Sequence, residues 1–489
     1  MKLKKLLQGI PSAQIRGSKE IEIMGLCNNS KRAAPGYLFF AKKGQRQDGS
    51  NFIVEASLAG VAAIATDLFD PFLKNVVQII HSDIAALEVS LAEKFYDNPS
   101  KKLLTIGITG TNGKTTCSYL IKHLLDSLNR PMGLIGTIEW IIKDNVLPSE
   151  QTTPDALTNQ KLFYEMVEAG CSGVVMEVSS HGLDQGRVRG VDFDLAVFTN
   201  LTQDHLDYHQ TMEAYAEAKA SLFSSLKSSS EKDKNYPKKA IINKDSPYAY
   251  KMMEGVTVSI LTYGLLEGAD LRAEEIAFSP NGTECFIKYQ EERIFFKSTL
   301  IGKFNVYNSL AAIAVGISLG FDLAEIVGVL SSFVSVSGRL ERVVTQSKKN
   351  IFVDYAHTED ALKNVLETLR EVSLGKVFCV FGCGGNRDRT KRPKMGLIAE
   401  ALADEVIVTS DNPRGEVPEL IIEEILSEIK DSKKVTVEVD RRLAIASAIK
   451  RLKLGDVLLI AGKGHENYQI FGQSTIHFDD RIVAKEYSK

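Results

Sequence analysis

The chain has 489 residues, and at about 150 residues per domain this length predicts roughly three domains. Its 59 Lys and Arg residues nearly balance 62 Asp and Glu residues, so the net charge of −3 excludes a general nucleic-acid coat protein. Hydrophobic residues at 44% and charged residues at 25% exclude long disorder and a disulfide-dense scaffold.

The sequence also predicts where the protein works. No apolar run approaches the roughly 20 residues that cross a bilayer, and Gly9 and Pro11 interrupt the basic N-terminal stretch before a signal sequence could form. Among the scattered cysteines, only Cys379 and Cys383 are close in sequence, and their apolar surroundings favour buried thiols over metal ligands. We expect a cytoplasmic protein in a reducing compartment, without membrane insertion and without a nucleic-acid partner.

Residues 1–100 contain short, irregular strand candidates at 38–43, 61–67 and 75–80, which predict a small mixed α/β domain. Residues 101–334 are more regular and predict a central P-loop domain around a largely parallel sheet, because continuous apolar runs are typical of strands covered on both faces. Its expected strands are 103–110, 173–180, 194–200 and 238–243, and its expected helices are 115–128 and 305–320.

Residues 335–489 predict a third domain, which is Rossmann-like. Four helical stretches separate five strand candidates, as in a doubly wound sheet. These strand candidates are 350–356, 376–382, 404–410, 434–439 and 456–462. The predicted fold class is therefore α/β with three domains.

A glycine-rich motif follows the first strand of the central domain. Backbone N–H groups and a helix N-terminus in such a loop bind phosphate, with Lys114 pairing the outer oxygens and Thr115 offering a hydroxyl to Mg²⁺. The usual first glycine is replaced by Ile108 and displaced to Gly110. We therefore predict binding of ATP or GTP by Gly110, Thr111, Asn112, Gly113, Lys114, Thr115 and Thr116.

Other polar residues follow neighbouring strands. Glu177, Asp204 and His205 are expected at the carboxyl ends of parallel strands, where they could converge on phosphates and a second cation. The alternative for His205 is a structural role as a helix cap or a core histidine. For His181 and His209, the choice between a functional and a structural role stays open. Lys219 lies in an alanine-rich helical stretch, and the composition of this stretch predicts that the lysine is on the protein surface.

The order of the motifs identifies the chain as resembling the Mur ligase family over nearly its whole length. The motifs are NNSKRAAPGYLFFA (28–41), GTNGKTT (110–116), TTPD (152–155), MEVSSHGL (176–183), NLTQDHLDYH (200–209), YAEAKASLF (215–223), GKFNVYNSLAA (302–312), SGRLER (337–342), DYAHT (354–358), GCGGNRDRTKRP (382–393), SDNPR (410–414) and AGKGHE (461–466).

The resemblance implies an amide ligase of peptidoglycan synthesis. ATP would phosphorylate the terminal carboxylate of UDP-N-acetylmuramoyl-L-alanyl-D-glutamate, and meso-diaminopimelate would attack the acyl phosphate. The family pattern implies that Lys219 is N-carboxylated and that Thr115, Glu177, His205 and Lys219 hold Mg²⁺, with Lys114 also catalytic. A carbamate in place of an ammonium makes the local charge favourable for a cation.

The same resemblance implies three sets of substrate contacts. ATP would meet Asn305, Asn308, Arg339 and Asp354 in addition to the P-loop. The UDP-sugar would meet Asn28, Ser30, Gln45, Arg46, Gln47, Thr152, Thr153, Ser179, Gln185 and Arg187. Gln45 stands where relatives commonly have histidine, and Arg46 could compensate by its charge.

Diaminopimelate would meet Arg387, Asp411, Asn412, Pro413, Arg414, Gly462 and Glu466. Its distal end carries a carboxylate and an ammonium, whereas lysine carries only the ammonium, so Arg414 would select diaminopimelate. The alternative is that DNPR is merely an Asn-Pro turn.

Three other functions remain open at this point. They are the L-lysine-adding ligase, a folylpolyglutamate synthase-like ligase and, from another class, a P-loop switch or motor. The expected partners of the ligase are small molecules, and we expect a monomer.

Overall fold

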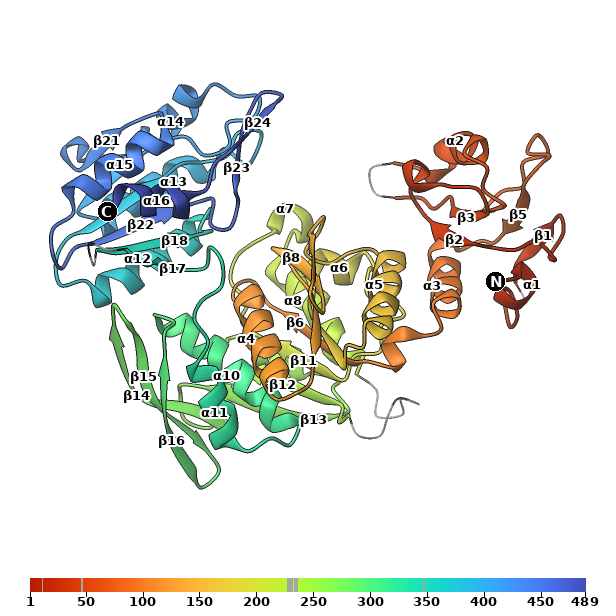
Figure 1. Ribbon diagram of the computed structural model, residues 1–489, viewed down its shortest axis with the longest axis horizontal. Helices are drawn as coiled ribbons and strands as arrows, with labels where there is room; N and C mark the ends of the chain where they lie inside the picture. Colours follow the sequence, from red (N-terminus) through yellow and green to blue (C-terminus); the bar gives the residue numbers. More distant parts are fainter. Residues whose placement is uncertain (11, 45–46, 227–231, 233–235, 346, 348) are drawn as a thin grey trace. The chain divides into compact units, whose positions relative to one another are not determined.

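The structure is a computed structural model of the chain (Figure 1). It describes residues 1–489 except 11, 45–46, 227–231, 233–235, 346 and 348. The described chain forms two compact units. The first comprises Met1–Lys114 and Leu125–Leu261, and the second comprises Thr115–Leu124 and Thr262–Lys489. The predicted three-domain division, with boundaries at 100 and 334, stays a prediction.

The N-terminal part of the first unit is a five-stranded sheet in the order β1-β5-β4-β3-β2. Strands β2 to β5 are parallel and β1 is an antiparallel edge strand. The three strands predicted here are confirmed as β3 to β5. The elements are α1 (Leu3–Leu6), β1 (Gln14–Arg16), β2 (Gly25–Cys27), β3 (Tyr37–Phe40), α2 (Ile53–Leu58), β4 (Ala63–Thr66), β5 (Val77–Ile80) and α3 (Ile84–Phe95).

The rest of the first unit is built on a larger sheet. Its strands follow the order β12-β11-β6-β10-β7-β8-β9, and the first five of these are parallel. The continuous apolar runs expected as strands are confirmed as β6, β10, β11 and β12. These strands are β6 (Leu104–Thr109), β7 (Met132–Ile135), β8 (Glu139–Ile142), β9 (Asn145–Pro148), β10 (Gly173–Glu177), β11 (Leu195–Phe198) and β12 (Lys239–Asn243).

Helices bury the apolar surface of this sheet. Phe163 of one helix and Tyr215 and Phe223 of another share a hydrophobic core with residues of β10 and β11. The carboxyl ends of the parallel strands therefore stay available for polar loops. The helices are α5 (Ala156–Glu168), α6 (Ser180–Asp184), α7 (Leu206–His209), α8 (Met212–Ser224) and α9 (Ala249–Met253).

Helix α4 (Lys114–Ser127) follows β6, and its Thr115–Leu124 segment belongs to the second unit. Two further helices, α10 (Lys303–Ser318) and α11 (Leu323–Ser331), lie in that unit. The Sγ atom of Cys117 on α4 lies 3.4 Å from Oδ1 of Asn308 on α10.

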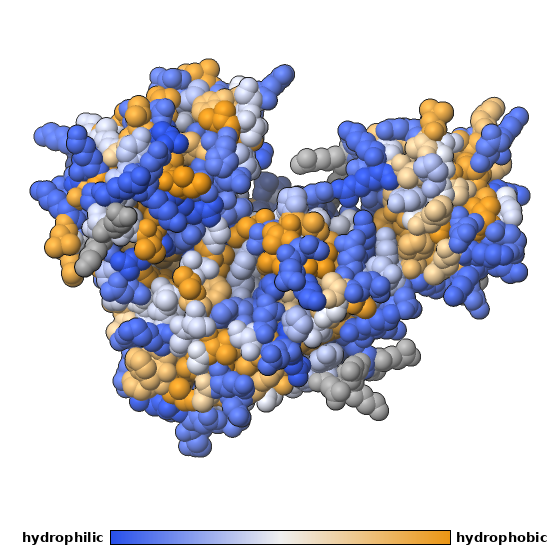
Figure 2. All heavy atoms as spheres, viewed as in Figure 1, coloured by the Kyte–Doolittle hydropathy of each residue, from blue (hydrophilic) through white to orange (hydrophobic). Residues whose placement is uncertain are grey.

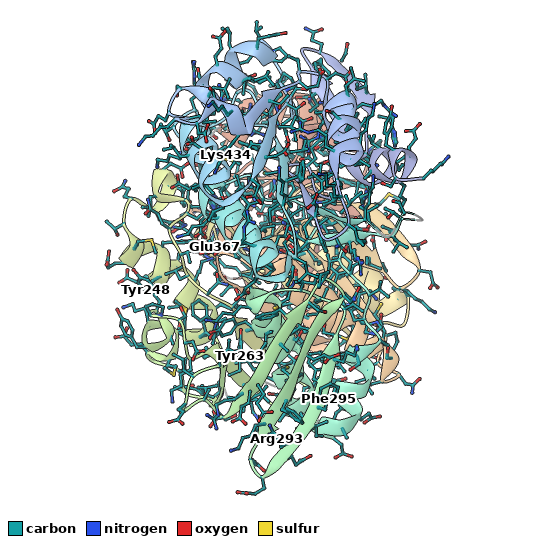
Figure 3. The ribbon with its side chains drawn as sticks, turned by 90° about the vertical axis from the view of Figure 1, so that its left-hand side faces the viewer. Tyr248, Tyr263, Arg293, Phe295, Glu367 and Lys434 are labelled. Carbon is teal, nitrogen blue, oxygen red and sulfur yellow. The ribbon has the colours of Figure 1, made fainter. Side chains whose placement is uncertain are left out.

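The second unit also contains an antiparallel meander that sequence analysis did not predict. Strands β14 (Leu271–Ser279), β15 (Gly282–Tyr289) and β16 (Glu292–Ser298) pair in order, and β13 (Ser259–Gly264) pairs in parallel with β14. Figure 3 shows these strands side by side, with Arg293 and Phe295 labelled on β16. The Arg293 guanidinium lies 3.7 Å from the ring centroid of Phe286, which supports a cross-strand cation–π contact.

The C-terminal part of the second unit is a six-stranded sheet in the order β17-β18-β22-β19-β20-β21. All neighbouring pairs are parallel except the edge pair β17–β18. The five predicted strands are confirmed as β18 to β22. These strands are β17 (Glu341–Val343), β18 (Asn350–Asp354), β19 (Val377–Phe381), β20 (Glu405–Val408), β21 (Val435–Val437) and β22 (Val457–Ala461).

Helices cover both faces of this sheet, which confirms the doubly wound arrangement. One core contains residues of α12, α13 and α14, and the other contains residues of α15 and α16. A hairpin of β23 (Tyr468–Phe471) and β24 (Ser474–His477) follows β22. The helices are α12 (Glu359–Val372), α13 (Lys391–Leu402), α14 (Pro418–Leu426), α15 (Arg441–Arg451) and α16 (Asp480–Tyr487).

The surface polarity and the burial of the cysteines are those expected from the amino-acid composition. Hydrophilic and hydrophobic residues intermingle over the face shown in Figure 2, and exposed side chains such as Leu58, Phe72 and Leu454 occur in both units. All six cysteines are buried, as predicted for Cys379 and Cys383. In the described part of the chain, every helix is too short or too polar to cross a membrane.

Candidate active site

The phosphate-binding motif lies between β6 and α4, as predicted. Ile108 is a buried residue of β6, so the loop begins only at Gly110. Gly110 has φ of 150°, and a Cβ atom there would lie 1.9 Å from Oγ1 of Thr199. Gly113 also has a positive φ, of 86°. These glycines let the loop approach the neighbouring strand end closely.

Two residues after β11 brace this loop, and sequence analysis did not single them out. The Thr199 hydroxyl donates to the Asn112 carbonyl at 2.6 Å, and Asn200 Oδ1 accepts from the Asn112 amide at 3.0 Å. The Asn200 carbonyl also accepts from the Thr111 amide at 2.9 Å. Their position at the carboxyl end of a parallel strand next to β6 is the signal that could have found them.

Lys219 is almost completely buried, so the surface position suggested by its composition is wrong. It is 1% exposed, and its Nζ donates to the Gly110 carbonyl at 2.8 Å. Lys114 Nζ donates to the same carbonyl at 2.9 Å and to the Thr111 carbonyl at 2.8 Å. Burial, together with the neighbouring Lys114 ammonium, lowers the pKa of Lys219 well below its usual value.

Glu177 is fully buried at the carboxyl end of β10. Its Oε1 accepts from the Thr137 amide at 2.8 Å, and its Oε2 accepts from the Thr137 hydroxyl at 3.0 Å. A Cβ atom on Gly136 would lie 2.6 Å from Oε1, so this glycine makes room for the carboxylate. The structure therefore holds an oriented carboxylate beside the P-loop strand.

His205 begins a turn between β11 and α8 in a left-handed conformation, with φ of 54°. Its ring lies 4.8 Å from that of His181, and the His209 ring stacks on Tyr215 at 5.1 Å. Burial lowers the pKa of all three histidines. Within the described residues, groups of three or more His, Cys, Asp or Glu side chains with metal-binding geometry do not occur.

Four of the residues predicted for the UDP-sugar are joined by hydrogen bonds, and a fifth, Thr152, is linked to them through Thr137 and Glu177. Thr153 Oγ1 lies 3.1 Å from Ser179 Oγ and donates to the Glu177 carbonyl at 2.9 Å. Arg187 Nη2 donates to Gln185 Oε1 at 2.7 Å, and its Nη1 donates to the Thr153 carbonyl at 3.0 Å. The fifth member, Thr152, lies 3.0 Å from the Thr137 hydroxyl.

The remaining residues of this set lie in the N-terminal part. Asn28 Nδ2 donates to Glu88 Oε1 at 2.7 Å and to Asp155 Oδ1 at 3.0 Å, which links Asn28 to the TTPD segment. Ser30 Oγ donates to Glu55 Oε2 at 3.0 Å. Gln47 accepts a backbone hydrogen bond from Gly44. Gln45 and Arg46 lie outside the described residues.

The predicted adenine residues Asn305 and Asn308 are buried on one face of α10. Asn308 Nδ2 donates to Asn305 Oδ1 at 3.0 Å, so each amide orients the other. Arg339 Nη2 lies 3.4 Å from the hydroxyl of Thr115 within the second unit. Asp354, at the end of β18, accepts from the backbone amides of Leu340 and Ala356, and its burial raises its pKa.

The residues predicted for the amino acid converge at the carboxyl ends of β19, β20 and β22. Asn412 Nδ2 donates to Glu466 Oε2 at 2.8 Å. Lys463 Nζ donates to Asn412 Oδ1 at 3.2 Å and to Glu466 Oε2 at 3.1 Å. Gly462 has φ of 111°, and a Cβ atom there would lie 2.8 Å from Asp411 Oδ2. These loops bring acidic and basic side chains side by side, and we use the name DNPR pocket for this group of residues: Asp411, Asn412, Arg414, Gly462, Lys463 and Glu466.

Arg414 has a left-handed backbone, with φ of 54°, that is fixed by hydrogen bonds. Its amide donates to the Ile470 carbonyl at 3.0 Å, and its Nη1 donates to the Gly385 carbonyl at 3.0 Å. The Pro413 carbonyl would lie 1.8 Å from a Cβ on Gly385, so the two loops pack closely. Arg414 also forms an isolated parallel bridge with Phe471, and the turn in this segment comes after Asn412, where the Glu416 amide donates to the Pro413 carbonyl at 3.1 Å.

Arg387 is the most peripheral member of the predicted set. Its side chain is exposed and donates to the Asn386 carbonyl at 3.4 Å. Arg392, at the start of α13, makes stronger contacts than Arg387. It donates to Glu416 and to Glu424 at 2.8–2.9 Å. A Cβ atom on Gly384 would lie 2.8 Å from Arg414 Nη1 and 3.7 Å from Arg387 Cγ, so the exposed Arg387 lies near Arg414.

The fold and the two groups of polar residues define an α/β protein with a P-loop for nucleotides and a second polar site in its C-terminal sheet. A strand, a glycine loop and a lysine-bearing helix form a P-loop of the kind that binds nucleotides, and the loops of a Rossmann-like sheet bring side chains of both charges together. A P-loop switch or motor accounts for the first feature but gives no role to the second.

Comparison with protein families supplies the particular class. Residues 108–316 match the Mur ligase middle domain, and residues 338–464 match the Mur ligase glutamate ligase domain. The chain belongs to the Mur ligase family.

Similar proteins match over nearly the full length. The UDP-N-acetylmuramoyl-L-alanyl-D-glutamate--2,6-diaminopimelate ligase of Chlamydia pneumoniae is 46% identical, with 99% of each chain covered. The enzyme of the same name from Caldanaerobacter subterraneus subsp. tengcongensis is 43% identical, over 99% of this chain and 98% of its own. A solved structure of a ligase with this name is 34% identical, with a TM-score of 0.72, and covers 100% of this chain and 98% of that one.

Proposed function

We propose that this protein is the ATP-dependent ligase that joins meso-2,6-diaminopimelate to UDP-N-acetylmuramoyl-L-alanyl-D-glutamate. The products are the UDP-muramoyl tripeptide, ADP and phosphate. The observation that carries this proposal is the DNPR pocket, in which Asp411, Glu466 and Arg414 can pair both charges of a zwitterionic side chain. The family membership and the P-loop support the ATP-dependent step.

The reaction follows from the chemistry of the two ends of the bond. A carboxylate oxygen of the dipeptide attacks the γ-phosphorus of ATP, and ADP leaves. The amine of diaminopimelate then attacks the acyl carbon, phosphate leaves, and the amine loses a proton. The P-loop amides and Lys114 would bind the phosphates, while Asn305, Asn308, Arg339 and Asp354 would contact the rest of ATP.

Lys219 would act as a carbamate. Only a neutral amine adds CO₂, forming an N–C bond and releasing a proton, and a lowered pKa increases the neutral fraction. Burial and the adjacent Lys114 supply this condition. The product is an anion in place of a cation, which would also attract Lys114 instead of repelling it.

The side chains here fit Mg²⁺ only if Lys219 is carboxylated, because two lysines on the Gly110 carbonyl would repel a cation. With the carbamate, Thr115, Glu177, His205 and Lys219 would supply hard oxygen donors and one imidazole. A bound Mg²⁺ would neutralise phosphate charge as the phosphoryl group is transferred. Thr137 and Gly136 keep the Glu177 carboxylate oriented for this role.

The UDP-sugar would bind to the cluster around Thr153, Ser179 and Arg187. The other proposed contacts are Thr152, Gln185, Asn28, Ser30, Gln45, Arg46 and Gln47. The Arg187 guanidinium could pair a phosphate or carboxylate of the substrate bidentately. Residues 1–100 would thus share the nucleotide-sugar site with this cluster, residues 101–334 would bind most of ATP, and residues 335–489 would bind the amino acid and complete the ATP site. We also propose that the enzyme is a cytoplasmic monomer.

The test is a measurement of phosphate release with each substrate omitted in turn. Turnover should require ATP, the UDP-muramoyl dipeptide and diaminopimelate together, and mass spectrometry should find the tripeptide. Phosphate release that is independent of both the dipeptide and the amino acid would support a P-loop switch or motor instead. Competition between diaminopimelate and L-lysine at fixed dipeptide distinguishes the two amino-acid specificities.

A further inference from the structure

The DNPR pocket contains a buried cation that has no role in the function proposed above. Lys463 follows Gly462 at the end of β22 and is 0% exposed. Its ammonium donates to Glu466 Oε2 at 3.1 Å and to Asn412 Oδ1 at 3.2 Å. It also lies 5.3 Å from the ring centroid of Tyr468. Burial of a lysine costs free energy unless it is paired, and here the Glu466 carboxylate supplies the opposite charge.

The contacts of Lys463 join two side chains that are proposed to hold the amino acid. Asn412 Oδ1 accepts a hydrogen bond from the Lys463 ammonium. Asn412 Nδ2 donates to Glu466 Oε2 at 2.8 Å, which is the oxygen that Lys463 also contacts. Asn412 Oδ1 also accepts from the Ile470 amide at 3.1 Å. Lys463, Asn412 and Glu466 therefore close a triangle of hydrogen bonds that fixes one carboxylate oxygen, Oε2. The other oxygen, Oε1, is not part of this triangle.

The charge of Lys463 also matters for the choice of substrate. Apart from Arg387, whose side chain is exposed to solvent, Asp411 and Glu466 contribute two negative charges, and Arg414 and Lys463 contribute two positive ones. The distal end of diaminopimelate has no net charge, because its carboxylate and ammonium cancel. The side chain of lysine has a charge of +1. A pocket with equal positive and negative charge favours diaminopimelate. A pocket that lacks one positive charge favours lysine.

We propose that Lys463 is a positioning and specificity-determining residue, which orients Glu466 and Asn412 and keeps the pocket electrically balanced for a zwitterionic side chain. This inference rests on the proposed function, which supplies the ligand. It goes beyond that function because Lys463 acts through its neighbours and is not one of the residues assigned to the amino acid.

Lys463→Met tests both parts of the inference. It keeps an unbranched side chain of similar length and removes the charge. The KM for diaminopimelate should rise by about tenfold or more, with little change in the KM values for ATP and the UDP-dipeptide. The ratio of kcat/KM for diaminopimelate to that for L-lysine should fall, because the more negative pocket penalises the distal carboxylate.

Lys463→Arg and Lys232→Met serve as matched controls. Lys463→Arg keeps the charge and should preserve the ratio even if the KM rises. Lys232 is another buried lysine, paired with Asp194 at 2.7 Å in the first unit. Lys232→Met removes a buried ion pair outside the DNPR pocket and should leave the ratio unchanged, whatever it does to stability.

A double-mutant cycle shows whether Lys463 works through Glu466. In the Glu466→Gln background, Lys463→Met should raise the KM for diaminopimelate by less than about threefold, because the oriented carboxylate is already gone. An equal effect in both backgrounds overturns the positioning role. An unchanged ratio of diaminopimelate to lysine in Lys463→Met overturns the specificity role.

The failure of the proposed function has a different signature. A wild-type protein that makes no tripeptide contradicts the ligase before any variant is made. A wild-type protein that prefers L-lysine contradicts the proposed substrate, and Lys463→Met must then still shift the ratio further toward lysine for the Lys463 inference to stand. A fall in kcat/KM of equal size for every substrate indicates a merely structural lysine.

Discussion

Two buried lysines, Lys219 beside the P-loop and Lys463 in the DNPR pocket, have opposite surroundings. Lys219 donates to a neutral carbonyl that it shares with another lysine, and burial lowers its pKa. Lys463 donates to the carboxylate of Glu466. The first environment favours loss of the positive charge and therefore carboxylation, whereas the second pairs the ammonium with a carboxylate. Burial alone does not determine what a lysine does, because the sign of the neighbouring charge decides.

The largest expected effect is that of Lys219→Ala. Loss of the carbamate removes a proposed anionic ligand, so kcat should fall by about 10³-fold or more, with partial recovery on addition of a short carboxylate such as acetate. Phosphate release measures the activity. With ¹³C-labelled bicarbonate, the wild type should show a carbamate NMR signal that is absent from Lys219→Ala.

Lys463→Met is the matched control for that signal, since it alters the other buried lysine. The carbamate resonance should persist in this variant. A signal that survives Lys219→Ala and disappears in Lys463→Met would reverse the comparison of the two lysines.

Lys114→Met should have the next largest effect. It removes a charge that is proposed to pair with the outer phosphates, and kcat should fall by about 10²-fold. It also removes the ammonium next to Lys219, so the pKa of Lys219 should rise and the carbamate signal at neutral pH should weaken. Lys161→Met, at an exposed position on α5, should change neither quantity. Near-normal turnover of Lys114→Met would remove the P-loop from the mechanism.

The sequence was sufficient to predict the structure where the residues of a proposed site form one continuous motif. The strand, glycines and lysine at 103–116 predicted β6, the loop and α4 because local backbone needs and phosphate chemistry coincide there. The doubly wound sheet was predictable for a similar reason. Its buried strands read as unbroken apolar runs.

The sequence was insufficient where a residue's role depends on distant neighbours. An alanine-rich helix does not reveal that Lys219 meets the Gly110 carbonyl, 109 residues away. Lys463, between two glycines, was not singled out, although its place after a buried strand was a signal. The meander β14–β16 was missed, yet its alternating burial is the usual pattern of a half-exposed strand.

Arg414→Ala tests the DNPR pocket with an intermediate effect. The distal carboxylate of diaminopimelate would lose its bidentate partner, so the KM for diaminopimelate should rise by about ten- to a hundredfold. The KM for ATP should change by less than about twofold. Arg389→Ala, at an exposed arginine paired with Glu424, is the control and should leave both values unchanged. Equal losses for both substrates would indicate misfolding.

The smallest expected effect concerns the support of this pocket by Glu416 and Arg392. Hydrogen bonds from Arg392 lower the pKa of Glu416 from 4.5 to about 2. A carboxyl group whose pKa is lower in the folded state stabilises the fold above its unfolded pKa, and this contribution is lost as the pH falls from about 4.5 toward 2. Solvent screens the partly exposed carboxylate, so Glu416→Gln should lower Tm by only about 2 °C near neutral pH.

Thermal unfolding of the wild type and Glu416→Gln between pH 6 and about pH 3.5 measures this contribution. The difference in Tm should be largest at pH 6 and should shrink as the pH falls below about 4.5, because Glu416 then binds a proton in the unfolded wild type and the unfolded state gains stability. A difference that stays constant over this range would show that the variant acts through packing and not through the charge of Glu416. The kcat/KM ratio for diaminopimelate over L-lysine should stay near the wild-type value, since the charges of Arg414 and Lys463 are retained.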